Sequence, residues 1–160
     1  MKTLAIGYGN SLRGDDGVGP WVADRVAAWN LPDVRSLSVH QLTPELAAEM
    51  AEAEVVFFID ACTIAGGRTQ ARLEPVASQK GRSQLDHLWS PSVLLHLANT
   101  LYDADPAAYQ ILIPAIRFDY GAPLSAIALE GAAWSLETLK DYIANPRSTR
   151  WKEALCTKSG

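Results

Sequence analysis

The sequence predicts a single α/β domain over residues 1–160: a three-layer α/β/α sandwich around a twisted sheet of about five strands, mostly parallel with one antiparallel edge strand. Three observations support this fold. Strand-like and helical apolar patterns alternate along the chain, without repeats or linkers. The nearly all-apolar run at 55–60, VVFFID, is typical of a parallel strand buried on both faces. The connection over 61–69 is too short for a parallel crossover, which needs about a dozen residues.

The first part of the chain predicts two strand–helix pairs followed by the buried strand. Apolar residues recur at helical spacing in GVGPWVADRVAAW, the predicted first helix. A second helix would begin with Thr43 as its N-cap, Pro44 at its first position and Glu45 near the positive end of its dipole. The predicted elements are strands at 3–7, 34–39 and 55–60 and helices at 17–29 and 43–53.

The second part of the chain adds the edge strand and two more helices. The strand at 70–76 should run antiparallel to the one before it, at an edge where Pro75 is tolerated. Residues 77–90 are polar and irregular, and Ser90-Pro91 begins a helix that continues to about 102. A parallel strand follows at 109–116. The last helix, at about 125–144, should turn four residues inward: Ile127, Leu136, Leu139 and Ile143.

Composition narrows the classes of function. The 160 residues are 48% hydrophobic, enough for a sizeable core, and carry a net charge of −4 without a dominant basic face. Residues 146–160 form a short basic stretch that we expect to be a solvated, flexible tail. No apolar run reaches the ~18 residues of a membrane span, and the apolar N-terminal run is too short for a signal peptide. Two cysteines fit a reducing compartment. We expect a cytoplasmic monomer that binds neither nucleic acid nor membranes.

Topology places three chemically capable groups at one edge of the sheet. Ligands of such folds bind beyond the carboxyl ends of the parallel strands. The first strand leads to Asp15 and Asp16, the strand at 55–60 ends in Asp60, and His87 precedes the helix whose N-terminus lies at the same edge. Two carboxylates and an imidazole suit a divalent cation with open positions. Each residue alone also has a simpler interpretation: a helix or turn cap for the aspartates, a surface position for His87.

Other residues near this edge are secondary candidates. His40 follows a parallel strand and could hydrogen-bond a ligand carboxylate or orient the Thr43 turn. His96 lies within an apolar helix and is interpreted as a core or rim residue. Cys62 is interpreted as a structural thiol.

Alternative chemistries have little support. The Rossmann fingerprint requires a third glycine where Leu12 stands, and adjacent anions would repel a pyrophosphate. No G-x-S-x-G elbow or H-E-x-x-H helix is present in the sequence.

These motifs resemble those of the nickel–iron hydrogenase maturation endopeptidases, over most of the chain. The segment GYGNSLRGDDGVG resembles the family's opening G-x-G-N-x-L-x-x-D-[DE]-G. VVFFIDA resembles the strand that ends in an aspartate, and HLWSPSVLLHLA the histidine before an L-x-L-A helix. HQLTPELA is similar to a variant seen in some members. Two departures are Trp89, close after the histidine, and the absence of a glycine before Pro114.

The resemblance implies a protease that removes the C-terminal extension of a hydrogenase large-subunit precursor after nickel insertion. Asp16, Asp60 and His87 would contact the nickel and carry catalysis. Nickel would arrive with the substrate, and other divalent ions could occupy the site. Residues expected around this set, in a second shell or facing substrate, are Gly9, Asn10, Asp15 and His40. Two alternative functions are a nickel-binding chaperone, which would use the same three residues without cleaving the precursor, and a hydrolase of small molecules.

Overall fold

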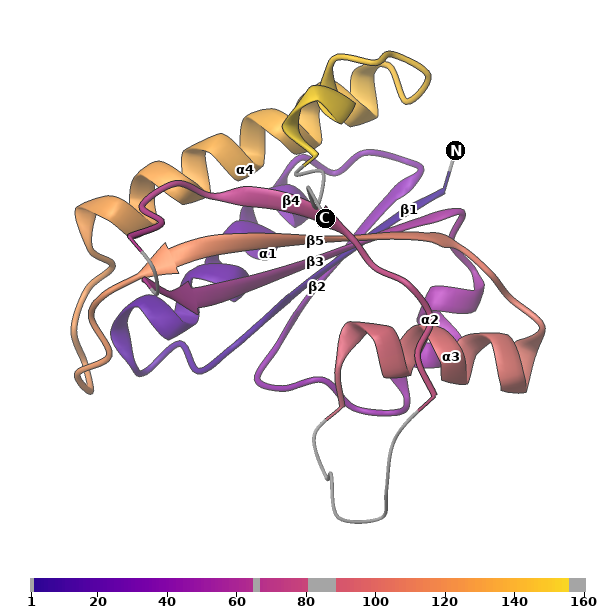
Figure 1. Ribbon diagram of the computed structural model, residues 1–160, viewed down its shortest axis with the longest axis horizontal. Coiled ribbons are helices and arrows are strands. Elements are labelled where there is room, and N and C mark those ends of the chain that lie inside the picture. Colours follow the sequence, from indigo (N-terminus) through magenta and orange to yellow (C-terminus); the bar gives the residue numbers. More distant parts are fainter. Residues whose placement is uncertain (1, 65–66, 81–88, 156–160) are drawn as a thin grey trace.

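The computed structural model describes residues 2–64, 67–80 and 89–155 and confirms the predicted α/β fold. Its five-stranded sheet has the order β2-β1-β3-β5-β4, and only β4 is antiparallel to its neighbour (Figure 1). The strands are β1 (Thr3–Tyr8), β2 (Val34–Val39), β3 (Val55–Thr63), β4 (Arg72–Pro75) and β5 (Ala107–Ala115).

Helices cover both faces of the sheet. They are η1 (Gly14–Gly17), α1 (Val18–Ala28), α2 (Leu46–Ala51), α3 (Pro91–Tyr102), α4 (Ala126–Ala144) and η2 (Trp151–Ala154). Figure 1 shows α1 and α4 on one side of the sheet and α2 and α3 on the other. Strand alternation divides the core accordingly, so that Phe57 and Ile59 pack under α1 and α4, and Phe58 packs under α2 and α3.

Helix α1 lies unusually close to the sheet because two glycines face each other there. A Cβ on Gly7 would overlap the carbonyl of Gly19, and a Cβ on Gly19 would overlap the carbonyl of Ile59. Only glycine permits this approach of backbone to backbone. The close packing fixes the start of α1, and with it the turn that joins β1 to α1.

The edge strand has the predicted direction, and its hydrogen-bonding partner is β5. Arg72 pairs with Leu112 and Pro75 with Tyr109. Since β5 is parallel to β3, β4 runs antiparallel to the strand before it, as its short connection predicts. Pro75 lies on the last strand of the sheet, where its missing N–H costs no ladder hydrogen bond.

The start of the second helix and the end of the buried strand differ from the prediction. Helix α2 begins at Leu46 and not at Thr43, because the preceding residues make i→i+3 bonds, from Leu46 N to the Thr43 carbonyl at 3.2 Å and from Ala47 N to the Pro44 carbonyl at 3.1 Å. Strand β3 continues to Thr63, three residues past Asp60, because β5 is long enough to pair with all of it. By contrast, α3 begins at Ser90-Pro91 as predicted, and Ser90 caps it by accepting a hydrogen bond from Val93 N at 3.2 Å.

The inward face of α4 includes the expected residues in part. Leu139 is buried, Leu136 and Ile143 are partly buried and pack against the core, and Ile127 is partly buried without belonging to that cluster. The buried face consists mainly of small or polar residues: Ala128, Gly131, Ala132, Ser135, Thr138, Leu139 and Tyr142. Small side chains let α4 lie close to the sheet, so apolar size alone does not identify its inward face.

The segment expected to be a flexible tail packs against the sheet as far as the structure describes it. Trp151 is 4% exposed, and its ring makes edge contacts with Phe57, Tyr109 and Tyr142, with centroids 5.1–6.4 Å apart. Leu155 forms a parallel bridge with Leu73 of the edge strand. Residues 156–160 lie outside the described part of the chain. Across 2–64, 67–80 and 89–155, no helix is both long and apolar enough to cross a membrane.

Candidate active site

A pocket of about 450 Å³ opens at the carboxyl edge of the sheet. The arrowheads of β3 and β5 mark this edge in Figure 1. Asp16 and Asp60 both line the pocket, so two of the three predicted site residues are brought together. The rest of the lining comes from the end of β1, the segment after β2 and the residue before the α3 cap: Tyr8, Gly9, His40, Gln41, Leu42, Thr43, Pro44 and Trp89.

Asp60 is a half-buried carboxylate on β3. Burial in the strand raises its pKa to about 6, and the nearby charge of Asp16 adds to this rise. Hydrogen bonds from the Tyr8 hydroxyl and from the backbone of Ala61 oppose it. Burial and the negative charge of Asp60 in turn raise the pKa of Tyr8, which therefore stays protonated and donates. The Tyr8 oxygen accepts a hydrogen bond from Gln110 Nε2 at 3.0 Å.

Asp16 is held by the glycine turn. Its Oδ2 accepts a hydrogen bond from the backbone N–H of Asn10 at 2.7 Å. The side chain of Asn10 accepts one from Leu12 N at 3.0 Å, which closes an Asx turn. Gly9 has a φ of +145°, and a Cβ there would overlap the carbonyl of Asp16. Gly9 and Asn10 therefore shape the turn that presents Asp16 to the pocket.

Asp15 has a different role from its neighbour. It is fully buried and does not line the pocket. Its carboxylate accepts hydrogen bonds from Ile116 N (2.9 Å), Arg117 N (3.1 Å), Ser125 N (2.7 Å) and Ser125 Oγ (2.6 Å). Burial alone would raise the pKa of Asp15, but these hydrogen bonds outweigh it and lower the pKa below its usual value. Asp15 thus joins the β1–η1 turn to the loop between β5 and α4.

The two histidines that the structure describes, His40 and His96, differ in whether they line the pocket. His40 is exposed at the rim of the pocket, directly after β2. His87, the predicted nitrogen donor, lies outside the described residues; Trp89, two positions later, lines the pocket. His96 is part of α3, where its side chain faces Thr100 Oγ1 at 3.5 Å, and it does not line the pocket.

The donor chemistry of the pocket suits a cation. Asp16 of η1 and Asp60 of β3 supply carboxylate oxygens, and their mutual repulsion would be relieved by a positive charge between them. Within the described residues, no group of three or more His, Cys, Asp or Glu side chains is arranged to hold a metal ion. The two carboxylates thus fit part of a ligand set whose third predicted member is His87.

Sequence reasoning missed Tyr8 and Gln110. The signal lies in strand alternation: Gly7 pairs with Ile59, so Tyr8 follows on the same face as Asp60, and Gln110 pairs with Phe58 on that face as well. A glutamine in an otherwise apolar central strand needs a polar partner. Once the sheet order is known, these two residues are the expected neighbours of Asp60.

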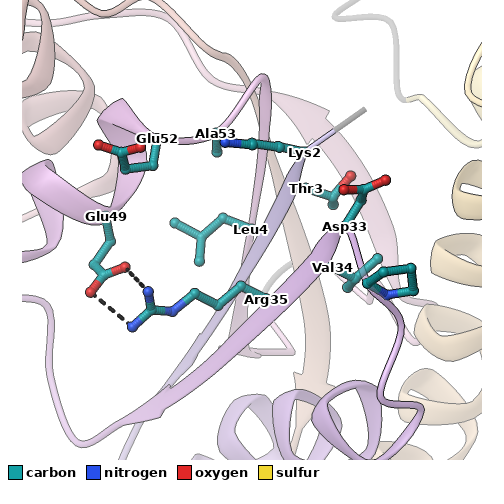
Figure 2. A pocket seen from close by; sticks show the side chains of 10 residues that line it. Lys2, Thr3, Leu4, Asp33, Val34, Arg35, Glu49, Glu52 and Ala53 are labelled. Carbon is teal, nitrogen blue, oxygen red and sulfur yellow. Dashed lines mark hydrogen bonds and ion pairs between the residues drawn. The ribbon is translucent and has the colours of Figure 1, made fainter.

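A second pocket, of about 170 Å³, lies at the opposite end of β1 and β2 (Figure 2). Its charged groups largely neutralise one another. Arg35 forms an ion pair with Glu49, with both of its terminal nitrogens bonded to the carboxylate at 2.9–3.0 Å. This pocket lacks the converging unpaired carboxylates of the carboxyl-edge pocket, so we place the candidate active site at the latter.

The fold has close counterparts among solved structures. The [NiFe] hydrogenase maturation protease HycI from Thermococcus kodakarensis KOD1 superposes with a TM-score of 0.72 at 20% identity, covering 90% of this chain and 93% of that one. HybD from the same organism gives 0.67 at 21% identity, over 88% and 98%. The hydrogenase maturating endopeptidase HybD from E. coli gives 0.67 at 16% identity, over 92% and 94%.

Sequence comparison alone finds less. No protein-family model matches the chain, and no curated protein matches it significantly. The structural likeness nevertheless extends over about nine tenths of the chain in each of the three comparisons. The protein therefore has the fold of the hydrogenase maturation proteases, as its motifs imply.

Proposed function

We propose that the protein is an endopeptidase that removes the C-terminal extension of a nickel–iron hydrogenase large-subunit precursor once nickel has been inserted. The observation that carries this proposal is the pair Asp16 and Asp60 in one pocket at the carboxyl edge of a maturation-protease fold. Each is positioned by its own hydrogen bonds, Asp16 by the Asn10 N–H and Asp60 by the Tyr8 hydroxyl. The opening motif independently resembles that of these proteases.

In this proposal nickel belongs to the substrate. Asp16, Asp60 and His87 would contact the metal already bound in the precursor and so place the adjacent peptide bond in the pocket. Bound nickel supplies positive charge that can polarise a carbonyl or a water molecule. Hydrolysis then breaks the C–N bond, adding the hydroxyl of water to the carbonyl carbon and the remaining proton to the leaving amine. Asp60, with a pKa of about 6, is largely ionised at neutral pH and can bind the cation.

Three further features complete the proposal. His40 and Trp89 at the rim would contact the extension, since both line the pocket beside the carboxylates. The protein would act in the cytoplasm as a monomer. Metal dependence would reside in recognition of the nickel-loaded precursor, and other divalent ions could occupy the same ligands in its absence.

The decisive experiment mixes the protein with the large-subunit precursor from the same organism, with and without nickel, and measures the mass of the large subunit. We expect the mass to fall by that of the C-terminal extension only with the nickel-loaded form. An unchanged mass with binding intact would identify a nickel-binding chaperone. Tight binding of a metal ion without any partner, combined with no effect on the precursor, would favour a hydrolase of small molecules.

A further inference from the structure

Two loops beside the active site are fastened to each other along their backbones. The Asp15 carboxylate binds the start and the end of the segment that joins β5 to α4, at Arg117 and at Ser125. Asp15 N also donates to the Arg117 carbonyl at 2.7 Å, and Gly121 N donates to the Leu12 carbonyl at 2.7 Å. The two loops therefore form one rigid unit rather than two independent segments.

This unit exposes large apolar side chains. Leu12 and Ile116 are each 56% exposed, and Tyr120 is 76% exposed. Among the described residues seven large hydrophobic side chains are exposed, and three of these lie on the two loops, with a fourth, Leu129, at the start of α4. Contiguous exposed apolar surface commonly marks a site of protein association.

The same unit carries two arginines whose guanidinium groups form no ion pair or hydrogen bond with the residues that the structure describes. Arg13 and Arg117 are exposed and take part in none of the salt bridges of the described residues. Asp119 is the only exposed acidic residue on these loops, since Asp15 is buried and Asp16 is half-buried in the pocket, so the exposed charge of the loops comes mainly from the two arginines. Arginine and tyrosine are enriched where protein interfaces gain most of their binding energy. We call Leu12, Arg13, Ile116, Arg117 and Tyr120 the loop surface.

A groove adjoins the loop surface. Its volume is about 540 Å³, and it runs between the β1–α1 connection and the start of α4. Trp21, Leu124 and Leu129 contribute apolar walls, and Gly14 and Ala122 come from the two fastened loops themselves. An apolar side chain from a partner would fit there without disturbing the loops.

We propose that the loop surface docks the folded body of the precursor protein, through an apolar patch on that protein with acidic groups at its edge. The proposal rests on the proposed function. Continuity with the active site supports this occupant: Asp16 lies in the same turn as Leu12 and Arg13, and its N–H donates to the Arg13 carbonyl at 3.1 Å. A protein seated on the loop surface would thus have its tail beside Asp16 and Asp60.

The loops are also prepared for such contact. A rigid surface loses little conformational freedom on binding, which removes part of the cost of association. The pocket and the loop surface have separate tasks in this scheme, because the pocket holds nickel and tail while the loop surface holds the body of the protein. Affinity and turnover should therefore respond differently to mutation.

The test measures affinity for the nickel-loaded precursor by calorimetry. It compares two variants of the loop surface with two control variants that carry the same substitutions at other exposed positions. Leu12→Ser and Arg117→Glu alter the loop surface. Leu101→Ser and Arg147→Glu make the same changes at exposed positions elsewhere, at the far end of α3 and after α4. None of the four side chains takes part in a hydrogen bond or ion pair in the described structure, so all four variants should fold.

We expect the two loop-surface variants to weaken affinity about tenfold or more, and the two control variants to change it by less than about twofold. Cleavage at saturating precursor should be nearly unchanged, so the effect falls on KM and not on kcat. Salt should weaken the wild-type complex more than the Arg117→Glu complex, because one screened attraction is already lost.

Two results would overturn the docking proposal while leaving the protease proposal intact: equal affinities for all four variants with normal cleavage, or a dimer of the protein in solution that Leu12→Ser separates. A wild-type protein that neither binds nor cleaves the precursor would overturn both proposals. Binding without cleavage that is sensitive to the loop-surface variants would support docking and contradict only the protease proposal.

Discussion

The Tyr8 hydroxyl donates a hydrogen bond to the carboxyl group of Asp60, and Gln110 Nε2 donates to the Tyr8 oxygen at 3.0 Å. The three side chains come from β1, β3 and β5, neighbouring strands at the centre of the sheet. The chain leaves Asp60 with two neutral donors, the Tyr8 hydroxyl and the backbone of Ala61, and no paired cation in the described structure. Its charge is therefore only partly compensated within the protein.

Replacing Tyr8 by Phe should raise the pKa of Asp60 further above 6. Burial already raises this pKa, and the hydrogen bond from Tyr8 is the larger of the two contributions that hold it down. If ionised Asp60 binds nickel, the acidic limb of the pH–activity profile moves to higher pH. The midpoint of that limb in single-turnover cleavage measures the shift. Tyr102→Phe, at an exposed position on α3, should leave the midpoint in place.

Asp60 should make stability fall as the pH rises. Its pKa is about 6 in the folded protein against a usual value of 3.8, so between these values the folded state binds more protons than the unfolded state. The associated stability is fully present below about pH 4 and is lost as the pH rises through 6; the loss is at most about 3 kcal/mol. Asp60→Asn should remove this contribution to the pH dependence and be more stable than the wild type at pH 8. Urea unfolding at pH 5 and pH 8 measures both effects, and a less stable variant at pH 8 would contradict the prediction.

Asp15→Asn should be strongly destabilising, by about 3 kcal/mol. Both carboxylate oxygens accept hydrogen bonds from N–H groups, so the amide NH₂ of asparagine must face at least one donor. The lowered pKa of Asp15 gives a contribution that is present above its usual pKa of 3.8 and lost as the pH falls through its folded value. Thermal unfolding at pH 7 measures the loss. Asp105→Asn, at an exposed carboxylate, is the control and should be nearly neutral.

Asp16→Asn, Asp60→Asn and His87→Ala should each abolish processing, since each removes a proposed nickel contact. None of the three should unfold the protein, as circular dichroism would show. His96→Ala should have the opposite balance, with slight destabilisation and retained processing, because His96 faces Thr100 on α3 outside the pocket. An essential His96 beside a dispensable His87 would show that the site assignment is wrong.

Trp151→Ala should cost about 3 kcal/mol, because it removes an almost fully buried ring from a cluster of aromatic residues. Trp89→Ala, at a half-buried position on the pocket rim, should cost less stability. Urea unfolding distinguishes the two. Equal losses of stability in the two variants would contradict the prediction, because they would show that Trp151 contributes no more to stability than Trp89 does.

The sequence predicted the layers, the strand directions and the convergence of Asp16 and Asp60 correctly, because these follow from apolar periodicity and from the length of connections. The Ser90-Pro91 pair also located the start of α3. For α4 periodicity identified Leu139 but not the small residues, such as Gly131 and Ala132, that make up much of the buried face. It could not show that Trp151 packs on Phe57, because that contact joins segments far apart in the sequence.

The same holds for the candidate site, where some residues follow from local sequence patterns and others require the tertiary structure. Strand ends identify which carboxylates reach the edge, but adjacent residues such as Asp15 and Asp16 are indistinguishable until tertiary hydrogen bonds separate them. Tyr8 and Gln110 require the register between strands, which depends on the whole sheet. His87 stays a prediction.

The bonds of Asp15 have a consequence for engineering the loop between β5 and α4. Residues 116, 117 and 125 are tied to Asp15, and Gly121 is tied to Leu12, so both ends of the β5–α4 loop are anchored next to Asp16. Residues 118–120 and 122–124 form two short spans free of these ties. New sequence can be grafted into either span, whereas an insertion at an anchor would displace the carboxylate beside it.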